Sequence, residues 1–368
     1  MFSRSEAWWW LVVLPVIALL LAASSAIADS VATRERQLIK VADDVYVIRH
    51  KEDPSPGFIF ANTTVIIGDR EVFVVDSDQT PAQAREDIAQ IHQLTDKPVR
   101  YLLNTHWHTD HNGGNHEYMA VFPSIAIIAT SETRKMMDEF APYVLSFWMK
   151  QVTAVREGLT RRLQTGKGPD GKPLTEADKN ALPARLKMVD DFVADVKTFV
   201  YQPPTITFEH DLTIYMGTGH EVQIRFLGRA NTGGDAIVYL PNESVLITGD
   251  VIDYPVPFAF DGYPSEWIQT LRTMAEFDAK TIIPGHGQVL HDKSYLYEVA
   301  ELMESVVNQV HQQFRANPSV TLEEVKKSVD LNEYRAKFAQ GDQRAGAFFD
   351  SSIGDSFVEL AYNERKQR

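Results

Sequence analysis

The sequence predicts an α/β domain of packed sheets and helices, with a helical insertion and further helices after the domain. Three observations predict this class. β-branched runs over residues 38–75 precede a helical segment and another strand, an order typical of layered α/β domains. Residues 131–200 are rich in helix-forming residues, and apolar residues recur at steps of three and four over residues 296–314.

The first half of the chain predicts strands interrupted by a single helix. The strands are expected at residues 45–48, 63–67, 72–75 and 99–103, where β-branched and aromatic residues are frequent. The helix is expected at residues 81–94, because Ile88 and Ile91 lie about one turn apart. The last of these strands leads directly into a histidine-rich segment.

Residues 131–200 predict a helix–loop–helix insertion. Gly166–Pro173 contains three glycines and two prolines and is expected to be the loop. Thr175, followed three residues later by Asp178, resembles a capping box that opens the second helix. Such an insertion fills space, contacts a second subunit or covers a site, and the sequence leaves these three roles open.

The remaining sequence predicts four more strands and then helices. The strands are expected at residues 205–208, 222–226, 236–240 and 245–248. The apolar stripe of residues 296–314 predicts a long helix that Asn317 and Pro318 end, and Thr321 with Glu324 resembles another capping box.

Composition restricts the partners that the chain can have. The chain has 368 residues, of which 44% are hydrophobic, enough for one large domain with appendages. The net charge of −14 and the absence of a basic stripe argue against a nucleic-acid partner. The expected partner is a small-molecule substrate. The chain has no cysteine, so disulfides, thiolate nucleophiles and cysteine-bound metals are excluded.

The first 28 residues predict a signal peptide. Arg4 provides a short basic region, residues 7–23 form an apolar run, and Ala26-Ile27-Ala28 offers a cleavage site before Asp29. We therefore expect a periplasmic or secreted protein. The alternative is an uncleaved signal anchor, because the apolar run approaches the length of a membrane span. No membrane partner is expected beyond this segment.

The strongest functional signal is the segment from Thr105 to Asn115. It carries His106, His108, Asp110 and His111 within six positions, directly after a predicted strand. Imidazole and carboxylate are the ligands that zinc accepts where thiolates are absent. In an extended segment His106 and His108 point to the same side, and the turn that follows directs Asp110 and His111 to a neighbouring position.

This pattern resembles the metallo-β-lactamase superfamily, whose hallmark is H-x-H-x-D-H after a strand. Three further segments, Val74–Ser77, Thr248-Gly249-Asp250 and Pro284-Gly285-His286-Gly287, follow the family order. The resemblance covers about residues 41–290. It implies a four-layer αββα sandwich at residues 29–295, with a helical extension at residues 296–368.

The resemblance also implies the roles of the site residues. His106 and His108 would hold a first metal, and Asp110, His111 and His286 a second. Asp250 would lie between the two, and Asp110 would also orient the attacking water as the catalytic residue. The expected cofactor is one or two zinc ions per chain.

One ligand position departs from the family pattern. Where the family has a third histidine for the first metal, in a G-x-x-H-T segment, this chain has Asn231. An amide oxygen binds zinc more weakly than imidazole does. Asn231 would therefore ligate weakly or bind a metal-bound water, or else the first site would stay largely empty. We expect a weakened first site.

The segment after Asp250 is rich in aromatic residues. Tyr254, Phe258 and Phe260 would either wall an apolar substrate pocket or pack in the core, and the sequence does not decide between these. Trp107, which lies between two of the expected ligands, is expected to point into the core.

These expectations combine into an exported zinc hydrolase. Metal-activated water would attack an acyl bond in an amide, lactam, ester or thioester, and β-lactamase-like activity is included. Two alternatives remain open. One is a mononuclear iron oxidoreductase of the same fold, of the sulfur dioxygenase type. The other is a non-catalytic binding protein that has lost its metal.

Overall fold

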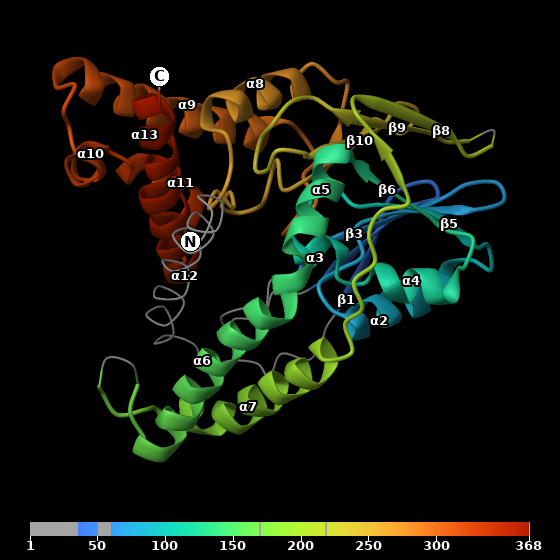
Figure 1. Cartoon of the computed structure of the whole chain (residues 1–368), viewed down its shortest axis with the longest axis horizontal. Helices are drawn as coiled ribbons and strands as arrows, with labels where there is room; N and C mark the ends of the chain where they lie inside the picture. The colour runs from blue at the N-terminus through green and yellow to red at the C-terminus, as the bar shows by residue number, and fades with distance from the viewer. Residues whose placement is uncertain (1–35, 51–59, 169–170, 218, 368) are drawn as a thin grey trace.

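Two sheets pack face to face, with helices covering both outer faces (Figure 1). The computed structural model describes residues 36–50, 60–168, 171–217 and 219–367. The predicted targeting segment at residues 1–28 lies outside these residues. The four-layer α/β fold expected from the sequence is confirmed.

The first sheet is built from consecutive strands. Its seven strands lie in the order β1-β2-β3-β4-β5-β6-β7, antiparallel from β1 to β4 and parallel from β4 to β7. The strands are β1 (Arg36–Ala42), β2 (Val45–His50), β3 (Thr63–Ile67), β4 (Val72–Val75), β5 (Val99–Leu103), β6 (Ala126–Thr130) and β7 (Ile206–Phe208). The central strands β3 and β4 are buried along their whole length, as their β-branched sequences suggest.

The second sheet uses the next part of the chain. Its five strands lie in the order β12-β11-β10-β9-β8, and only β11 and β12 are parallel. The strands are β8 (Asp211–Tyr215), β9 (Glu221–Phe226), β10 (Ala236–Leu240), β11 (Val245–Gly249) and β12 (Thr281–Pro284).

Three hydrophobic clusters hold the four layers together. One lies between the sheets and joins residues such as Val75 and Ile247. The second packs the first sheet against α2 (Pro81–Leu94) and α4 (Asn115–Val121). The third packs the second sheet against α8 (Pro264–Met274) and α9 (Ser294–Ala316). The α2 helix begins where the sequence predicted, with Thr80 as its cap and Pro81 in its first turn.

The expected insertion corresponds to three helices, α5 (Ser131–Phe140), α6 (Val144–Thr165) and α7 (Glu176–Val196), with a 3-10 turn at Ala141–Tyr143. The capping box of Thr175 and Asp178 is present at the start of α7. The α6–α7 hairpin extends away from the sheets (Figure 1) and has a hydrophobic cluster of its own around Trp148 and Phe192.

The C-terminal helices pack onto α9 and α8. They are α10 (Leu322–Ser328), α11 (Asn332–Ala339), α12 (Gln343–Phe349), a π-helical segment at Asp350–Phe357 and α13 (Val358–Gln367). Their buried residues, such as Phe349 and Phe357, belong to the same cluster as the second sheet. The predicted capping box of Thr321 and Glu324 opens α10. Among the described residues, we find no helix long and apolar enough to cross a bilayer.

Candidate metal centre

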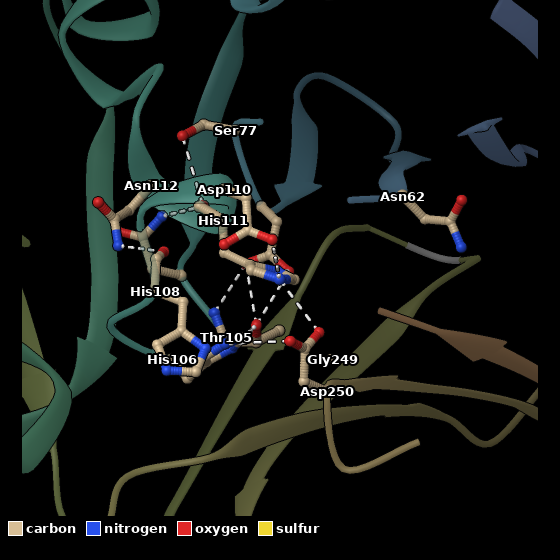
Figure 2. Close-up of polar contacts among 12 residues, drawn as sticks. Asn62, Ser77, Thr105, His106, His108, Asp110, His111, Asn112, Gly249 and Asp250 are labelled. Carbon is tan, nitrogen blue, oxygen red and sulfur yellow. Dashed lines mark hydrogen bonds and ion pairs between the residues drawn. The ribbon is translucent and has the colours of Figure 1, made fainter. Parts of the chain in front are cut away.

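The six predicted ligands converge at one edge of the sandwich, just after the strands that carry them. His106 and His108 follow β5, and Asp110 and His111 lie on the short helix α3 (Thr109–Asn112). Asp250 follows β11 and His286 follows β12, so the second sheet supplies the other two. Figure 2 shows Asp250 approaching the histidines from the opposite sheet.

The ligand atoms form two adjoining sets. His106, His108 and Asp250 each place one nitrogen or oxygen within 4.8 Å of the others, and Asp110, His111 and His286 do the same. Asp250 contacts both sets, because its Oδ2 lies 3.4 Å from His106 Nε2 and its Oδ1 lies 3.0 Å from His111 Nε2. This is the arrangement that the family resemblance implied, with Asp250 between the two positions.

Burial and charge prepare the cluster for a cation. Burial, together with the neighbouring His106, lowers the pKa of His108 to about 3, so its imidazole is neutral and can ligate. Burial acts to raise the pKa of Asp250, but the surrounding histidines outweigh it and hold that pKa well below its ordinary value. Asp110 likewise has a pKa of about 2 despite its burial, because of His111 and His286. Both carboxylates are therefore anionic at neutral pH.

Three of the histidines are oriented by hydrogen bonds at Nδ1, the ring nitrogen that points away from the cluster. His111 Nδ1 donates to the Asp76 carboxylate at 2.8 Å, and His286 Nδ1 donates to the Phe60 carbonyl at 2.9 Å. His106 Nδ1 lies 3.1 Å from Thr105 Oγ1, which itself donates to Asp76. In each ring Nε2 faces the cluster, as in histidines that bind metals. Despite their burial, the pKa values of His111 and His286 are raised well above the ordinary value by the neighbouring carboxylates, so a bound cation would replace the proton on Nε2 of these two rings.

Several buried polar atoms of the cluster lack a hydrogen-bond partner within the described part of the chain. They include His106 Nε2, Asp250 Oδ1 and both side-chain atoms of Asn231. Buried polar atoms without partners are costly and need an explanation. A bound cation would use the first two directly, and imidazole with carboxylate is a suitable donor set for zinc. The residues present therefore fit the metal that the fold implies.

Asn231 lies fully buried in the loop between β9 and β10. The end of this loop is tied to the first sheet, because Ala236 N donates to the carbonyl of Thr105 at 2.8 Å. The Asp235 carboxylate holds the loop closed by accepting from Thr232 N at 2.7 Å. These contacts place the loop beside the strand end that carries His106. Whether the Asn231 amide contributes to metal binding stays a prediction.

The three aromatic residues proposed as a substrate pocket lie in two different places. The Phe258 ring lies 6.0 Å from the His108 ring and 4.8 Å from Phe260, which is itself buried. Tyr254 instead packs against Tyr295, with ring centroids 5.0 Å apart. Tyr254 lines a different cavity of about 290 Å³, between the loop after His286 and α11. Of the three, Phe258 is the one whose ring contacts the ring of an expected metal ligand.

Trp107 is buried, as the sequence suggested. Its ring lies 4.6 Å from His108 and 5.3 Å from Phe140 of α5. The insertion therefore reaches the metal centre through an aromatic contact.

Asp253, which lies in the same cluster, was not predicted from the sequence. Its carboxyl is buried close to Asp250 and His286. Burial and the charge of Asp250 raise its pKa well above the ordinary value. No motif spacing distinguishes this aspartate, so the sequence offered no signal for it.

A second buried cluster, also missed, lies on the α2 side of the first sheet. His50 sits between Asp78, at 3.0 Å, and Asp87, at 3.1 Å, and Arg36 Nε donates to Asp87 at 2.8 Å. Two cations thus face two carboxylates. This pairing makes the cluster a buried ion-pair network.

Comparison with known proteins identifies the family. The model of the metallo-beta-lactamase superfamily matches residues 56–286. In sequence, the chain is 26% identical over 277 residues to a linear primary-alkylsulfatase of Pseudomonas sp. (strain ATCC 19151), covering 73% of this chain and 49% of that protein. It is also 33% identical over 78 residues to alkyl/aryl-sulfatase BDS1 of Saccharomyces cerevisiae (strain ATCC 204508 / S288c), covering 21% of this chain and 11% of that one. The chain thus spans at most about half the length of these curated relatives.

Solved structures share the fold. The inverting sec-alkylsulfatase Pisa1 from Pseudomonas sp. superposes with a TM-score of 0.60 at 16% identity, covering 94% of this chain and 54% of that one. The DIM-1 metallo-beta-lactamase superposes with a TM-score of 0.50 at 16% identity, covering 74% and 98%. At these identities the likeness concerns the fold. Since the family model spans most of the chain, the chain belongs to the metallo-beta-lactamase superfamily, the family from whose resemblance a metal-dependent hydrolase was predicted.

Proposed function

We propose that this chain is an exported zinc hydrolase that cleaves the ester of an apolar alcohol, with a sulfate ester as the first candidate. The observation that carries the proposal is the half-buried Phe258 ring beside His108, which places an apolar surface next to the metal-binding cluster. The sulfate ester is suggested by the names of the two relatives that match in sequence.

The cluster supplies the groups that hydrolysis needs. A bound zinc ion lowers the pKa of water to about 7 and polarises the bond to be cleaved. His106, His108 and Asp250 would hold one such ion, and Asp110, His111 and His286 would hold a second. Asp110 is half-buried, and its Oδ2 lies 3.2 Å from His286 Nε2, so it faces the cluster as an anionic acceptor. Asp110 is therefore suited to accept the proton of the attacking water and to return it to the departing alcohol oxygen.

The apolar surface extends beyond Phe258. Phe348 of α12 lies 6.1 Å from Phe258 and 5.7 Å from Phe260. The His108 ring also lies 4.6 Å from that of Trp107, which is in edge-to-face contact with Phe140. Aromatic surfaces of this kind gain free energy by taking apolar groups out of water. The carbon group of the substrate is thus expected to be alkyl or aryl.

An acyl bond, the substrate expected from the sequence, is the second candidate. It is supported by the aspartate at position 250, which resembles glyoxalase II and other general hydrolases of the family more closely than the β-lactamases. The same water and the same Asp110 would serve an acyl ester or a thioester. The iron oxidoreductase and the metal-free binding protein are the other candidates, and metal analysis separates these two from a zinc hydrolase.

The first test combines metal content with a substrate panel. Purified protein is analysed for zinc and iron, and hydrolysis is followed with short and long linear alkyl sulfates, an aryl sulfate, an acyl ester and a cephalosporin. We expect zinc, hydrolysis of the long alkyl sulfate or the aryl sulfate, and loss of activity with a chelator or in Asp110→Asn. Preference for the acyl ester would replace the sulfate proposal. Iron as the native metal, or no bound metal, would refute the hydrolase.

Export is tested separately. N-terminal sequencing of the protein from fractionated cells should find a mature chain beginning at Asp29 in the periplasm or the medium. A full-length chain in the membrane would instead indicate the uncleaved anchor, and one in the cytoplasm would contradict export.

A further inference from the structure

We propose that Asn62 is a positioning residue that fixes His286 and thereby sets the metal affinity of the site. Asn62 lies directly before β3 in the first sheet and is buried. Its side-chain Nδ2 donates to two carbonyls, Pro284 O at 2.9 Å and Gly287 O at 3.0 Å. Its backbone N–H donates to Gly285 O at 2.7 Å. One residue therefore binds the loop that carries His286 on both sides of the histidine.

The same segment also fixes the ring of His286. Phe60, two residues before Asn62, accepts the hydrogen bond from His286 Nδ1. This bond places the proton on Nδ1 and leaves Nε2 available as a ligand. Asn62 fixes the backbone of the loop and Phe60 fixes the imidazole, so together they determine where His286 Nε2 lies.

These bonds join the two sheets at the metal centre. His286 follows β12 of the second sheet, whereas Asn62 precedes β3 of the first. Figure 2 shows Asn62 to the side of the cluster, away from the ligands. Asn62 thus acts on the site through the loop of His286, which makes it a positioning residue.

The loop around His286 is packed too closely to shift without changing the cluster. A Cβ atom on Gly285 would lie 2.0 Å from Asp250 Oδ1, and one on Gly287, where φ is +87°, would lie 2.1 Å from the Tyr254 carbonyl. If the side chain of Asn62 is lost, two carbonyls of this loop lose their donor. The loop would have to move to find new partners, and any movement changes the position of His286 relative to Asp250.

The inference rests on the metal dependence of the proposed function but on no particular substrate. Asn62→Leu removes both side-chain donors at similar volume, and Asn62→Asp keeps the shape but replaces the donors with acceptors. Thr64→Val is the matched control, because Thr64 is buried on β3 and its hydroxyl has no hydrogen-bond partner within the described residues. Zinc or cobalt affinity is measured by titration of the metal-free full chain, in a wild-type and in a His286→Ala background.

We expect Asn62→Leu and Asn62→Asp to weaken the metal affinity by about 10- to 100-fold in the wild-type background, as is usual when the group orienting a ligand is lost. In the His286→Ala background the same changes should have little further effect, because Asn62 acts through His286. Thr64→Val should bind as the wild type does. In the Asn62 variants the His286 ring should also lose its fixed orientation, so its signals in NMR spectra of the zinc-bound chain should change.

Two outcomes overturn the proposal. Equal losses in both backgrounds would show that Asn62 supports the fold in general, and an unchanged affinity in the folded variants would show that His286 does not need this support. If His286→Ala weakens metal binding while the Asn62 variants do not, only the inference fails. If the wild type binds no metal, the proposed function fails with it.

Discussion

Asp76 is the residue whose replacement tests most directly how the cluster is organised. Its buried carboxylate accepts from His111 Nδ1 and from Thr105 N, each at 2.8 Å, and from Thr105 Oγ1 at 2.9 Å. Asp76→Asn keeps an oxygen for the Thr105 N–H but turns an amide N–H₂ toward the N–H of His111. The backbone tolerates the change, because φ of Asp76 is +62° and asparagine adopts this conformation readily.

The magnitude follows from the bond that is lost. A hydrogen bond to a charged group contributes about 1.5–3 kcal/mol, and here both partners are buried, so solvent does not screen it. We therefore expect the free energy of unfolding of the metal-free chain to fall by about 2 kcal/mol. With His111 free to rotate, the metal affinity should fall by about 10- to 100-fold.

Urea denaturation and metal titration measure the two effects, with the exposed Asp96→Asn as the control. If Asp76→Asn matches the wild type in both the free energy of unfolding and the metal affinity, the Asp76 carboxylate does not orient His111. If stability falls but metal affinity does not, Asp76 supports the fold alone.

Three further predictions concern other parts of the chain. Phe258→Ala should raise KM for a long alkyl sulfate about tenfold, because about half of the binding free energy of a buried phenylalanine would be lost. The kcat and the KM for a short alkyl sulfate should change little. Equal effects on both chain lengths would contradict an apolar wall. Asn231→His should raise the metal content or affinity at the His106 side of the site, because imidazole is the stronger zinc ligand, and a lower metal content would contradict a weakened first site. Burial raises the pKa of Asp78 to about 6. The protonated Asp78 carboxyl therefore stabilises the folded chain fully below the ordinary pKa of 3.8, and this stabilisation is lost as the pH rises through about 6. In Asp78→Asn the free energy of unfolding should therefore fall less between pH 4 and 6 than in the wild type, and identical pH profiles would show that Asp78 does not titrate in this range.

The local sequence was sufficient to predict most elements and the metal cluster. The helix at Pro81–Leu94 and the capping box of Thr175 have the predicted bounds and partners, because both depend on residues close together in the chain. His106 and its neighbours were predicted because their spacing is itself the signal. The strands β6, β8 and β12 were not predicted, although β6 and β12 each contain two adjacent isoleucines.

The residues that organise the cluster could not be predicted in the same way. Asn62 contacts a loop more than 220 positions later in the sequence, and asparagine is common before strands. Phe348 of α12 packs against Phe258 in a loop much earlier in the chain, a contact that no local pattern reveals. Tyr254 and Phe258 seemed alike in sequence, but the path of the chain between them turns their rings to different sides.

The division of the ligands between two sheets determines when the site can exist during synthesis. All strands of the first sheet come from residues 36–208 and all those of the second from residues 211–284. Four of the six ligands therefore leave the ribosome long before Asp250 and His286. A nascent chain can hold a metal only loosely until its second sheet has been made and has closed over the first. Metal loading would thus be among the last events in the folding of the chain, and a chain truncated before His286 would lack a complete site.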